Sequence, residues 1–369
     1  MKNWYQRILY LALTASVLLG CTLSAPMPAL ASNPDIMEVL FIDVGQGDST
    51  LITYGDHAML IDAGDDSKGT AIQNYLQQQK ITKLDYLILT HPDADHIGGA
   101  PVIITKFDIS KVFVSNYEKD NKTYQKLIQA LDNKRLKALT PKVNSKYTLG
   151  TATMTILAPG KEYDNPNDSS IALLLKNGNS SFLFTGDAGE DAEADILATD
   201  ISLSADVYKV GHHGSKYSTS KELIKAVNPT YAVISCGEGN SYGHPHAETL
   251  NTLRANGVKV YRTDEAGTVV ATTDGKTLSF NVPASETWKA GEPTDSAGTT
   301  KESASSVKET PSKSAAPVTT ELTYVLNSKT KKFHKPTCGS LPTTNRVDSS
   351  ESRDSIIAQG YEPCKKCNP

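Results

Sequence analysis

Four residues with side chains that commonly bind metal ions lie within six positions, at His91, Asp93, Asp95 and His96. They follow directly on the apolar run at 86–89. A loop after a strand can turn alternate side chains toward one centre, and imidazole together with carboxylate suits Zn²⁺, Mn²⁺ or iron. Proline and aspartate are also common in solvated turns, which is the alternative for this segment taken alone.

Further candidate ligands follow two other apolar runs. Asp187 comes after the run at 182–184, and His212 and His213 come after the run at 207–210. Divalent ions held by such residues lower the pKa of a bound water, and paired ions clamp the attacking and leaving oxygens of a phosphodiester. The sequence therefore predicts a metal-dependent hydrolase.

The elements that must position these residues are short apolar runs separated by amphipathic stretches. The runs at 51–53 and 59–61 flank a turn, which is a hairpin signal. We predict an α/β fold in which helices cover sheets and polar ligands gather at one sheet edge. The predicted helices are 70–79, 122–135, 191–198, 220–227 and 246–256.

Six stretches resemble the metallo-β-lactamase superfamily, and within it the soluble domain of the ComEC competence proteins. The resemblance implies an αββα sandwich with a two-metal hydrolase site on its edge, in a domain proposed to degrade a DNA strand. The stretches are FIDVGQGDS (41–49), LIDAG (60–64), THPDADHIGG (90–99), FTGDA (184–188), KVGHHGSK (209–216) and YGHPH (242–246).

The resemblance assigns ligand roles in the first metal loop. His91, Asp95 and His96 match the superfamily's metal loop, whereas Asp93 stands where many members have histidine and the competence subgroup shares the aspartate. A carboxylate at that position favours oxygen-loving ions such as Mn²⁺, and Zn²⁺ is the alternative.

Later ligands carry over unevenly. Asp187 matches the aspartate that bridges both metals, and His213 is the expected late ligand with His212 facing substrate, although the two can be exchanged. The superfamily's middle histidine is absent, because 167–170 reads Asn-Asp-Ser-Ser. Either Asp168 is a weak ligand or the first site is open. The resemblance implies two divalent ions, zinc or manganese.

Catalytic roles follow from the same assignments. Asp95 is expected to ligate and to orient the nucleophilic water. His212 or His244 is expected to stabilise a developing oxyanion or to protonate the leaving group. Asp48 and Asp62, together with Asp43, are interpreted as supports for the loops rather than as catalytic groups.

The end of the chain carries a second candidate metal site. His334 and Cys338, followed by Cys364 and Cys367, form a four-ligand set for one structural zinc. A disulfide between two of the cysteines is the alternative in an oxidising compartment, but it leaves one cysteine over.

The C-terminal segment 321–369 resembles the metal-binding domain of the Ada methylphosphotriester repair proteins. In that family the first ligand is a cysteine that accepts the methyl group, and here it is His334. The resemblance therefore implies the metal fold without methyl transfer. Lysines surround the site and either meet phosphates or are simply solvated; they are Lys329, Lys331, Lys332, Lys335, Lys365 and Lys366.

The N-terminal segment 1–31 has the pattern of a secretory signal, with Lys2 and Arg7 before an uncharged apolar stretch. Leu-Leu-Gly-Cys resembles a lipobox ending at Cys21, which would make a lipoprotein with a membrane anchor. Ala-Leu-Ala at 29–31 resembles an ordinary cleavage site, which would release a secreted protein, and an uncleaved anchor is a third alternative. Each places the remaining chain outside the cytoplasm.

Composition divides the remainder into three parts. Residues 37–282 are rich in apolar runs and form the predicted hydrolase domain, 283–320 form a linker without Leu, Ile, Phe or Tyr, and 321–369 form the zinc module. A net charge of −4 gives no global signal for nucleic acid. DNA is the predicted substrate; another ester, such as a phosphorylcholine ester or a lactone, or a DNA- or cell-wall-binding role with weak activity are the alternatives. No partner protein is evident.

Overall fold

The computed structural model describes residues 36–292, 324–335, 338, 341–342, 345–349, 356 and 361–367. The chain divides into two compact units between Gly298 and Thr299. The predicted signal, with Cys21, lies outside the described residues, as does most of the predicted linker. Within the described residues, no helix combines the length and the apolar character that a membrane crossing needs.

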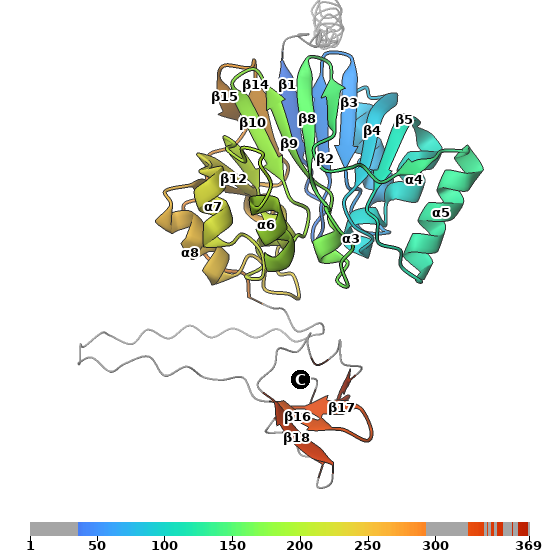
Figure 1. The fold of residues 1–369 in the computed structure, drawn as a ribbon, viewed down its shortest axis with the longest axis vertical. Helices are drawn as coiled ribbons and strands as arrows, with labels where there is room; N and C mark the ends of the chain where they lie inside the picture. The colour runs from blue at the N-terminus through green and yellow to red at the C-terminus, as the bar shows by residue number, and fades with distance from the viewer. Residues whose placement is uncertain are drawn as a thin grey trace, which may run out of the picture. The chain divides into compact units, whose positions relative to one another are not determined.

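Two β-sheets form the centre of the larger unit (Figure 1). The first runs in the order β15-β14-β1-β2-β3-β4-β5-β6. Its strands are β1 (Met37–Phe41), β2 (Thr50–Tyr54), β3 (His57–Ile61), β4 (Lys83–Leu89), β5 (Asp108–Val114), β6 (Ala138–Leu139), β14 (Val269–Thr273) and β15 (Leu278–Phe280).

The second sheet runs in the order β13-β12-β11-β10-β9-β8-β7. Its strands are β7 (Lys146–Leu149), β8 (Ala152–Ala158), β9 (Ala172–Asn177), β10 (Ser180–Phe184), β11 (Val207–Lys209), β12 (Tyr231–Ile234) and β13 (Lys259–Arg262). Strands β10 to β13 are parallel to one another, as are β3 to β6 in the first sheet. Their carboxyl ends therefore gather at one edge of each sheet.

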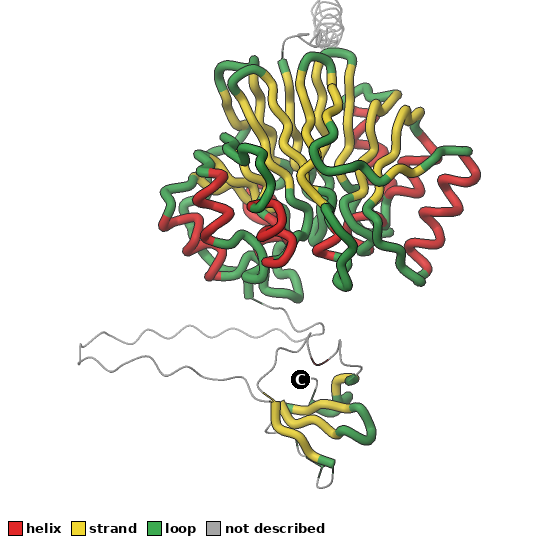
Figure 2. Tube along the Cα trace, in the orientation of Figure 1, coloured by secondary structure: helices red, strands yellow, loops and turns green. Residues whose placement is uncertain are grey.

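Helices cover the outer faces of both sheets, and the strands lie between them (Figure 2). On the first sheet these are α2 (Gly69–Gln78), α3 (Ala94–Ile97), α4 (Ala100–Lys106) and α5 (Lys122–Lys134). On the second they are α6 (Glu190–Leu197), α7 (Lys221–Val227) and α8 (Ala247–Ala255), with α9 (Thr263–Ala266) after β13. Short 3₁₀ turns occupy η1 (Asn167–Ser169) and η2 (Gly211–Gly214). The predicted α/β sandwich is confirmed.

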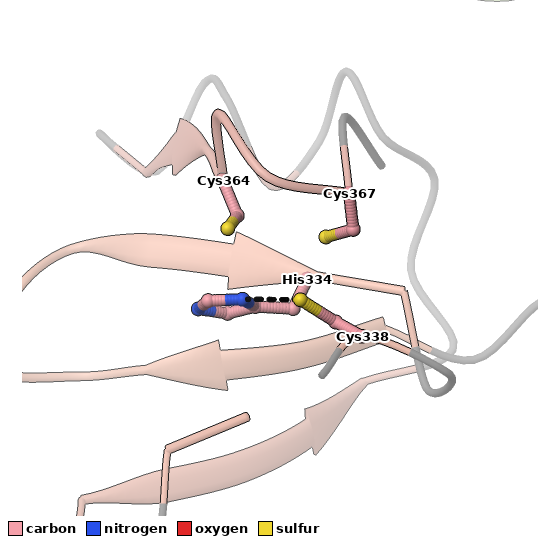
Figure 3. Close-up of side chains that lie close together, drawn as sticks. All are labelled: His334, Cys338, Cys364 and Cys367. Atoms are coloured by element: carbon pink, nitrogen blue, oxygen red, sulfur yellow. Dashed lines mark hydrogen bonds between the residues drawn. The ribbon is translucent and has the colours of Figure 1, made fainter. Parts of the chain in front are cut away.

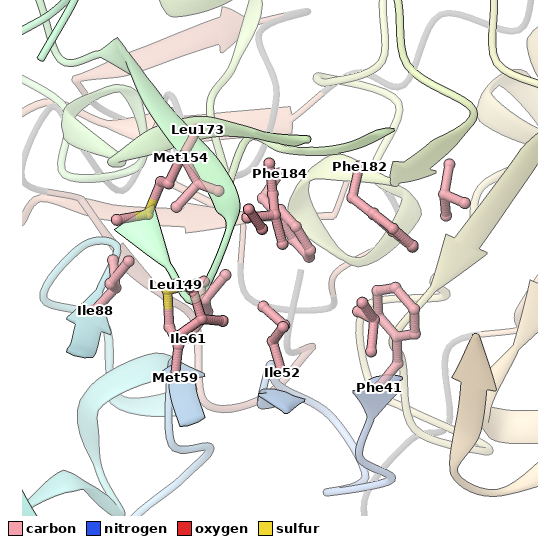
Figure 4. Close-up of a cluster of buried hydrophobic side chains, with 14 of the residues drawn as sticks. Phe41, Ile52, Met59, Ile61, Ile88, Leu149, Met154, Leu173, Phe182 and Phe184 are labelled. Carbon is pink, nitrogen blue, oxygen red and sulfur yellow. The ribbon is translucent and has the colours of Figure 1, made fainter. Parts of the chain in front are cut away.

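The apolar runs are continuous because most central strands are buried on both faces. In β1, Val39 and Phe41 face the core between the sheets, whereas Leu40 packs under the helices of the first sheet. This alternation is the two-residue period of a strand. Figure 4 shows the inner core, where Phe41 of the first sheet lies opposite Phe182 and Phe184 of the second.

Residues 283–292 pack on the larger unit, which differs from their predicted place in the linker. Ser285 donates its backbone N–H to Val260, and Gly291 donates to Pro245. Trp288 packs against the core under α8. The Arg254 guanidinium carbon lies over the Trp288 ring, 5.3 Å from the ring centroid. Backbone hydrogen bonds and one large aromatic side chain thus hold a segment whose composition is otherwise that of a linker.

The smaller unit contains a four-stranded sheet in the order β18-β16-β17-β19. Its strands are β16 (Tyr324–Asn327), β17 (Lys332–His334), β18 (Arg346–Ser349) and β19 (Glu362–Pro363). Its described core is small and consists of Tyr324, Leu326, Phe333, Ile356 and Tyr361.

Candidate metal centre

The loop after β4 brings two histidines into the interior at the sheet edge. His91 begins the bend that follows β4, and His96 lies in α3, which begins at Ala94. Both side chains are buried, and their ring centroids are 4.1 Å apart. Asp95, also in α3, retains 31% side-chain exposure and is therefore accessible to solvent.

Asp187 is the common centre of the histidines from both sheets. It follows β10 and is 3% exposed. Its Oδ2 atom is surrounded by four Nε2 atoms: His96 at 3.3 Å, His213 at 3.4 Å, His212 at 3.7 Å and His91 at 3.9 Å. Asp95 Oδ2 lies 3.2 Å from His213 Nε2. The structure thus gathers residues from three separate loops that the sequence predicts as ligands.

The turn after β11 orients the last two histidines through an unusual backbone. His212 and His213 have φ values of 49° and 54°, and Gly214 follows with 85°. Such left-handed conformations are costly for non-glycine residues and concentrate at functional sites. A Cβ at Gly214 would lie 2.6 Å from Pro245 Cβ, so only glycine fits there.

The donor atoms of this cluster fit divalent metal ions. Ligand atoms of Asp48, His96, Asp187 and His213 all lie within 4.8 Å of one another. His91 Nε2 and Asp187 Oδ1 are buried and have no hydrogen-bond partner. Burial lowers the pKa of His91 to about 4, so its imidazole is a neutral donor at physiological pH. Unsatisfied buried polar atoms are costly, and a cation would satisfy both.

Asp62 fixes the orientation of His96. Its Oδ2 lies 2.8 Å from His96 Nδ1, while Thr90 donates its N–H and its hydroxyl to the two carboxylate oxygens at 2.7 Å each. With Nδ1 engaged, His96 presents Nε2 to Asp187. A carboxylate behind a ligating histidine sets its tautomer and raises its basicity. The interpretation of Asp62 as a support agrees with this placement.

Asp48, which also belongs to the ligand group above, lies behind His213 together with a lysine that the sequence analysis did not single out. His213 Nδ1 lies 3.1 Å from the Ser235 carbonyl and 3.4 Å from Asp48 Oδ1. Lys209 Nζ bonds Asp48 Oδ2 at 2.8 Å, and both side chains are buried. Burial raises the pKa of Asp48, but Lys209 and His213 outweigh it and hold the pKa below its usual value. A charged residue inside an apolar run was the available signal for Lys209.

The family comparison agrees with this geometry. The sequence profile of the metallo-beta-lactamase superfamily matches residues 42–238, which is more than half of the chain. The chain belongs to the metallo-beta-lactamase superfamily. The resemblance inferred from the six short stretches is thereby confirmed, and the chain is a hydrolase of this superfamily, whose members are generally metal-dependent.

Curated relatives of this metallo-beta-lactamase chain include proteins of competence systems. ComE operon protein 3 of Bacillus subtilis is 31% identical over 264 residues, or 66% of this chain and 34% of that protein. Recombination protein 2 of Haemophilus influenzae is 31% identical over 233 residues, or 62% and 28%. Competence protein ComA of Neisseria gonorrhoeae is 29% identical over 228 residues, or 61% and 30%. The chain thus spans about a third of their length.

Two predicted ligands of this metallo-beta-lactamase site are turned to other partners. Asp93 Oδ1 forms an ion pair with Lys119 Nζ at 2.5 Å. Asp168 accepts the backbone N–H of Gly189 at 2.9 Å and the side-chain amide of Asn165 at 3.3 Å. Asp168 therefore supports the loop after Asp187, and the structure does not bring it to the cluster. The part of the centre nearest His91 is left with fewer donors than the part nearest His213.

We expect Lys119→Met to tighten the binding of a second divalent ion at least about tenfold, because it frees the Asp93 carboxylate and removes a nearby positive charge. The measurement is Mn²⁺ or Zn²⁺ titration calorimetry with a mass-spectrometric count of bound ions. Lys126→Met is the matched control, since Lys126 forms an equally short ion pair with Asp66 at the surface. Unchanged second-ion affinity in Lys119→Met would contradict the competition.

The C-terminal group is a separate metal-binding candidate. Figure 3 shows His334 and Cys338 facing Cys364 and Cys367, and their ligand atoms lie within 4.8 Å of one another. His334 Nδ1 is 3.5 Å from Cys338 Sγ. No disulfide joins any of the described cysteines. Three sulfurs and one imidazole fit a closed tetrahedral zinc site.

Proposed function

We propose that this chain is an extracytoplasmic metal-dependent phosphodiesterase that cleaves DNA, with two divalent ions, zinc or manganese, at the sheet edge. One observation carries the proposal: His96 and His213 converge on Asp187, Asp95 lies against His213, and buried atoms of Asp187 and His91 lack a hydrogen-bond partner. Support for a nucleic-acid substrate comes from the competence-system relatives.

The residues divide the work of hydrolysis by their exposure. A bound divalent cation supplies Lewis acidity, which neutralises charge on phosphoryl oxygens and lowers the pKa of water. Asp187, which is 3% exposed, anchors the interior of the site. Asp95, at 31% side-chain exposure, would ligate a bound cation and orient the attacking water. His212, at 25%, faces the incoming substrate.

His244 is arranged as a neutral hydrogen-bond donor. Gly237 N–H donates to Gln46 Oε1 at 3.3 Å, which directs Gln46 Nε2 toward His244 Nδ1 at 3.4 Å. His244 Nδ1 therefore accepts, and its proton resides on Nε2. Burial and the neighbouring histidines lower the pKa of His244 to about 3. This favours stabilisation of an oxyanion by Nε2–H over protonation of the leaving group.

We expect Gln46→Glu to lower kcat about 100-fold, because a carboxylate would accept from Nδ1–H and remove the proton from Nε2 of His244. The measurement is steady-state kinetics on the cleaved phosphodiester, with metal content determined in parallel. Metal content should stay at the wild-type value, since Gln46 contacts His244 and not the Asp187 cluster. A wild-type kcat would contradict the assigned tautomer.

For the smaller unit, the proposal includes one structural zinc and a contact with phosphates. Five lysines there are exposed: Lys329, Lys331, Lys335, Lys365 and Lys366. Tethering this unit to the hydrolase would raise the local concentration of a polyanionic substrate. Cleavage should therefore weaken with salt more steeply in the full chain than in residues 36–292.

The deciding experiment is a substrate panel with the full chain and Mn²⁺ or Zn²⁺. It contains single- and double-stranded DNA, RNA, a phosphorylcholine ester and a lactone. Metal-dependent cleavage of DNA supports the proposal. Hydrolysis of the phosphorylcholine ester or the lactone without cleavage of any DNA would overturn it and establish an esterase of another kind.

A further inference from the structure

Two exposed aromatic side chains lie in the loops that carry the site histidines. Among the described residues, the large apolar side chains exposed by more than a third include only two aromatics, Tyr242 at 61% and Tyr217 at 47%. Tyr217 lies four positions after His213, and Tyr242 two positions before His244. Exposed aromatic rings offer flat faces on which a ligand ring can stack, so their position beside the site makes them candidates for a binding role.

The ring of Tyr242 extends the histidine cluster outward. It stacks on His244 with ring centroids 5.5 Å apart and an interplanar angle of 18°. The His244 ring in turn meets His212 edge-on at 5.6 Å, and His212 Nε2 lies 3.7 Å from Asp187. A flat group lying on the outer face of Tyr242 would therefore be two rings away from the metal cluster.

The loop that carries Tyr242 is braced from inside. Asn240 is 8% exposed and donates its amide to the carbonyls of Gly237 and His244, at 2.9 and 2.7 Å. Its Oδ1 accepts the N–H groups of Tyr242 and His244 at 3.1 and 3.0 Å. One buried side chain thus fixes both ends of the segment, so the aromatic ring is pre-organised for a ligand.

A positive charge accompanies the second ring. Lys216 Nζ lies 5.3 Å from the Tyr217 ring centroid. The Lys216 backbone N–H donates to His246 Nδ1 at 3.1 Å, and His246 meets His244 edge-on at 4.9 Å. The two loops are therefore joined beside the centre, and together they present aromatic faces and an ammonium group. Stacking surfaces with cations are the elements that hold single-stranded nucleic acids.

We propose that Tyr242 is a stacking platform for an unpaired nucleobase adjacent to the scissile phosphodiester, with Lys216 contacting a neighbouring phosphate. The inference rests on the proposed phosphodiesterase function and narrows its substrate to single strands. A base within a duplex is already stacked between its neighbours and paired, so its face is not available to Tyr242. Every base has such a face, so the platform selects strandedness and not sequence.

The test measures binding apart from cleavage. A short fluorescent thymidine strand with phosphorothioate linkages, which resist hydrolysis, is titrated with the metal-loaded full chain. A matched strand with abasic sugars carries the same charges without bases. We expect wild-type protein to bind the base-bearing strand at least about fivefold more tightly than the abasic strand, since stacking on an aromatic ring contributes about 1–3 kcal/mol per base.

Variants separate stacking from a structural role. Tyr242→Ala should remove the preference for bases and leave abasic affinity unchanged, while Tyr242→Phe and Tyr242→Trp should retain the preference. Leu139→Ala, at an exposed position of β6, is the matched control for loss of exposed apolar surface. An equal loss for both strands in Tyr242→Ala, or no base preference in wild type, would overturn the platform. Failure of the proposed phosphodiesterase function is a separate result, because it would be seen as an absence of DNA cleavage in the substrate panel.

Discussion

Replacing Asp187 with asparagine should lower kcat/KM at least about a thousandfold, which corresponds to about 4 kcal/mol of transition-state stabilisation. Its Oδ2 lies within 4 Å of a nitrogen from each of four histidines. The amide removes the negative charge that faces these imidazoles and that would hold a divalent cation among them. The measurement is kcat/KM with added Mn²⁺ or Zn²⁺, alongside the number of ions bound per chain.

Two further variants make the loss interpretable. Asp62→Asn weakens only the support behind His96, and such changes lower metal affinity about 10- to 100-fold. Asp195→Asn alters a partly exposed carboxylate that pairs with Lys161 and Tyr163. Neither partner belongs to the metal cluster, so this variant should retain wild-type metal content. We expect the loss of activity and of bound metal to be largest in Asp187→Asn, smaller in Asp62→Asn and absent in Asp195→Asn. Wild-type turnover in Asp187→Asn would rule out the centre described here.

Most of the fold could be predicted from the sequence because the hydrophobic pattern of its strands and longer helices is regular. Continuous apolar runs predict strands buried on both faces, and the predicted helix at 122–135 agrees with α5 to within a residue. Helix α4 was not predicted, because its seven residues directly after the metal loop are too few for a clear period. The packing of Trp288 was not predicted, because the segment around it has the composition of a linker and a single aromatic residue does not change that composition.

The supports of the site were harder to predict than its histidines. Metal ligands can be predicted from their residue types and spacing. Lys209 and Gln46 instead act through their contacts with Asp48 and His244, which are far away in the sequence. Lys119 lies 26 positions from Asp93, and nothing local indicates their ion pair. Asp168 has a side chain that could bind a metal, but its carboxylate accepts hydrogen bonds from Gly189 and Asn165 instead. Such partners become visible only once the topology is known.

Removal of zinc should unfold the smaller unit while the hydrolase unit stays intact. The described core of the smaller unit comprises five side chains, too few to offset the conformational entropy of segment 321–369. Metal binding to a Cys/His site is coupled to folding and supplies on the order of 10 kcal/mol. We therefore expect Cys364→Ser to abolish protection of the β16–β17 amides in hydrogen exchange, a change of several orders of magnitude in rate.

Cys236→Ser is the matched control for the loss of a thiol. Cys236 is buried in the larger unit, next to Thr263, and lies in neither metal-binding group. Because the substitution leaves the smaller unit untouched, the β16–β17 amides should keep their protection in Cys236→Ser. A chelator would strip both metal sites at once, so the variant and not the chelator assigns the effect to the His334 site. If Cys364→Ser kept wild-type protection in β16 and β17, the sheet would be stable through its own packing, and the four residues would not be a structural metal site.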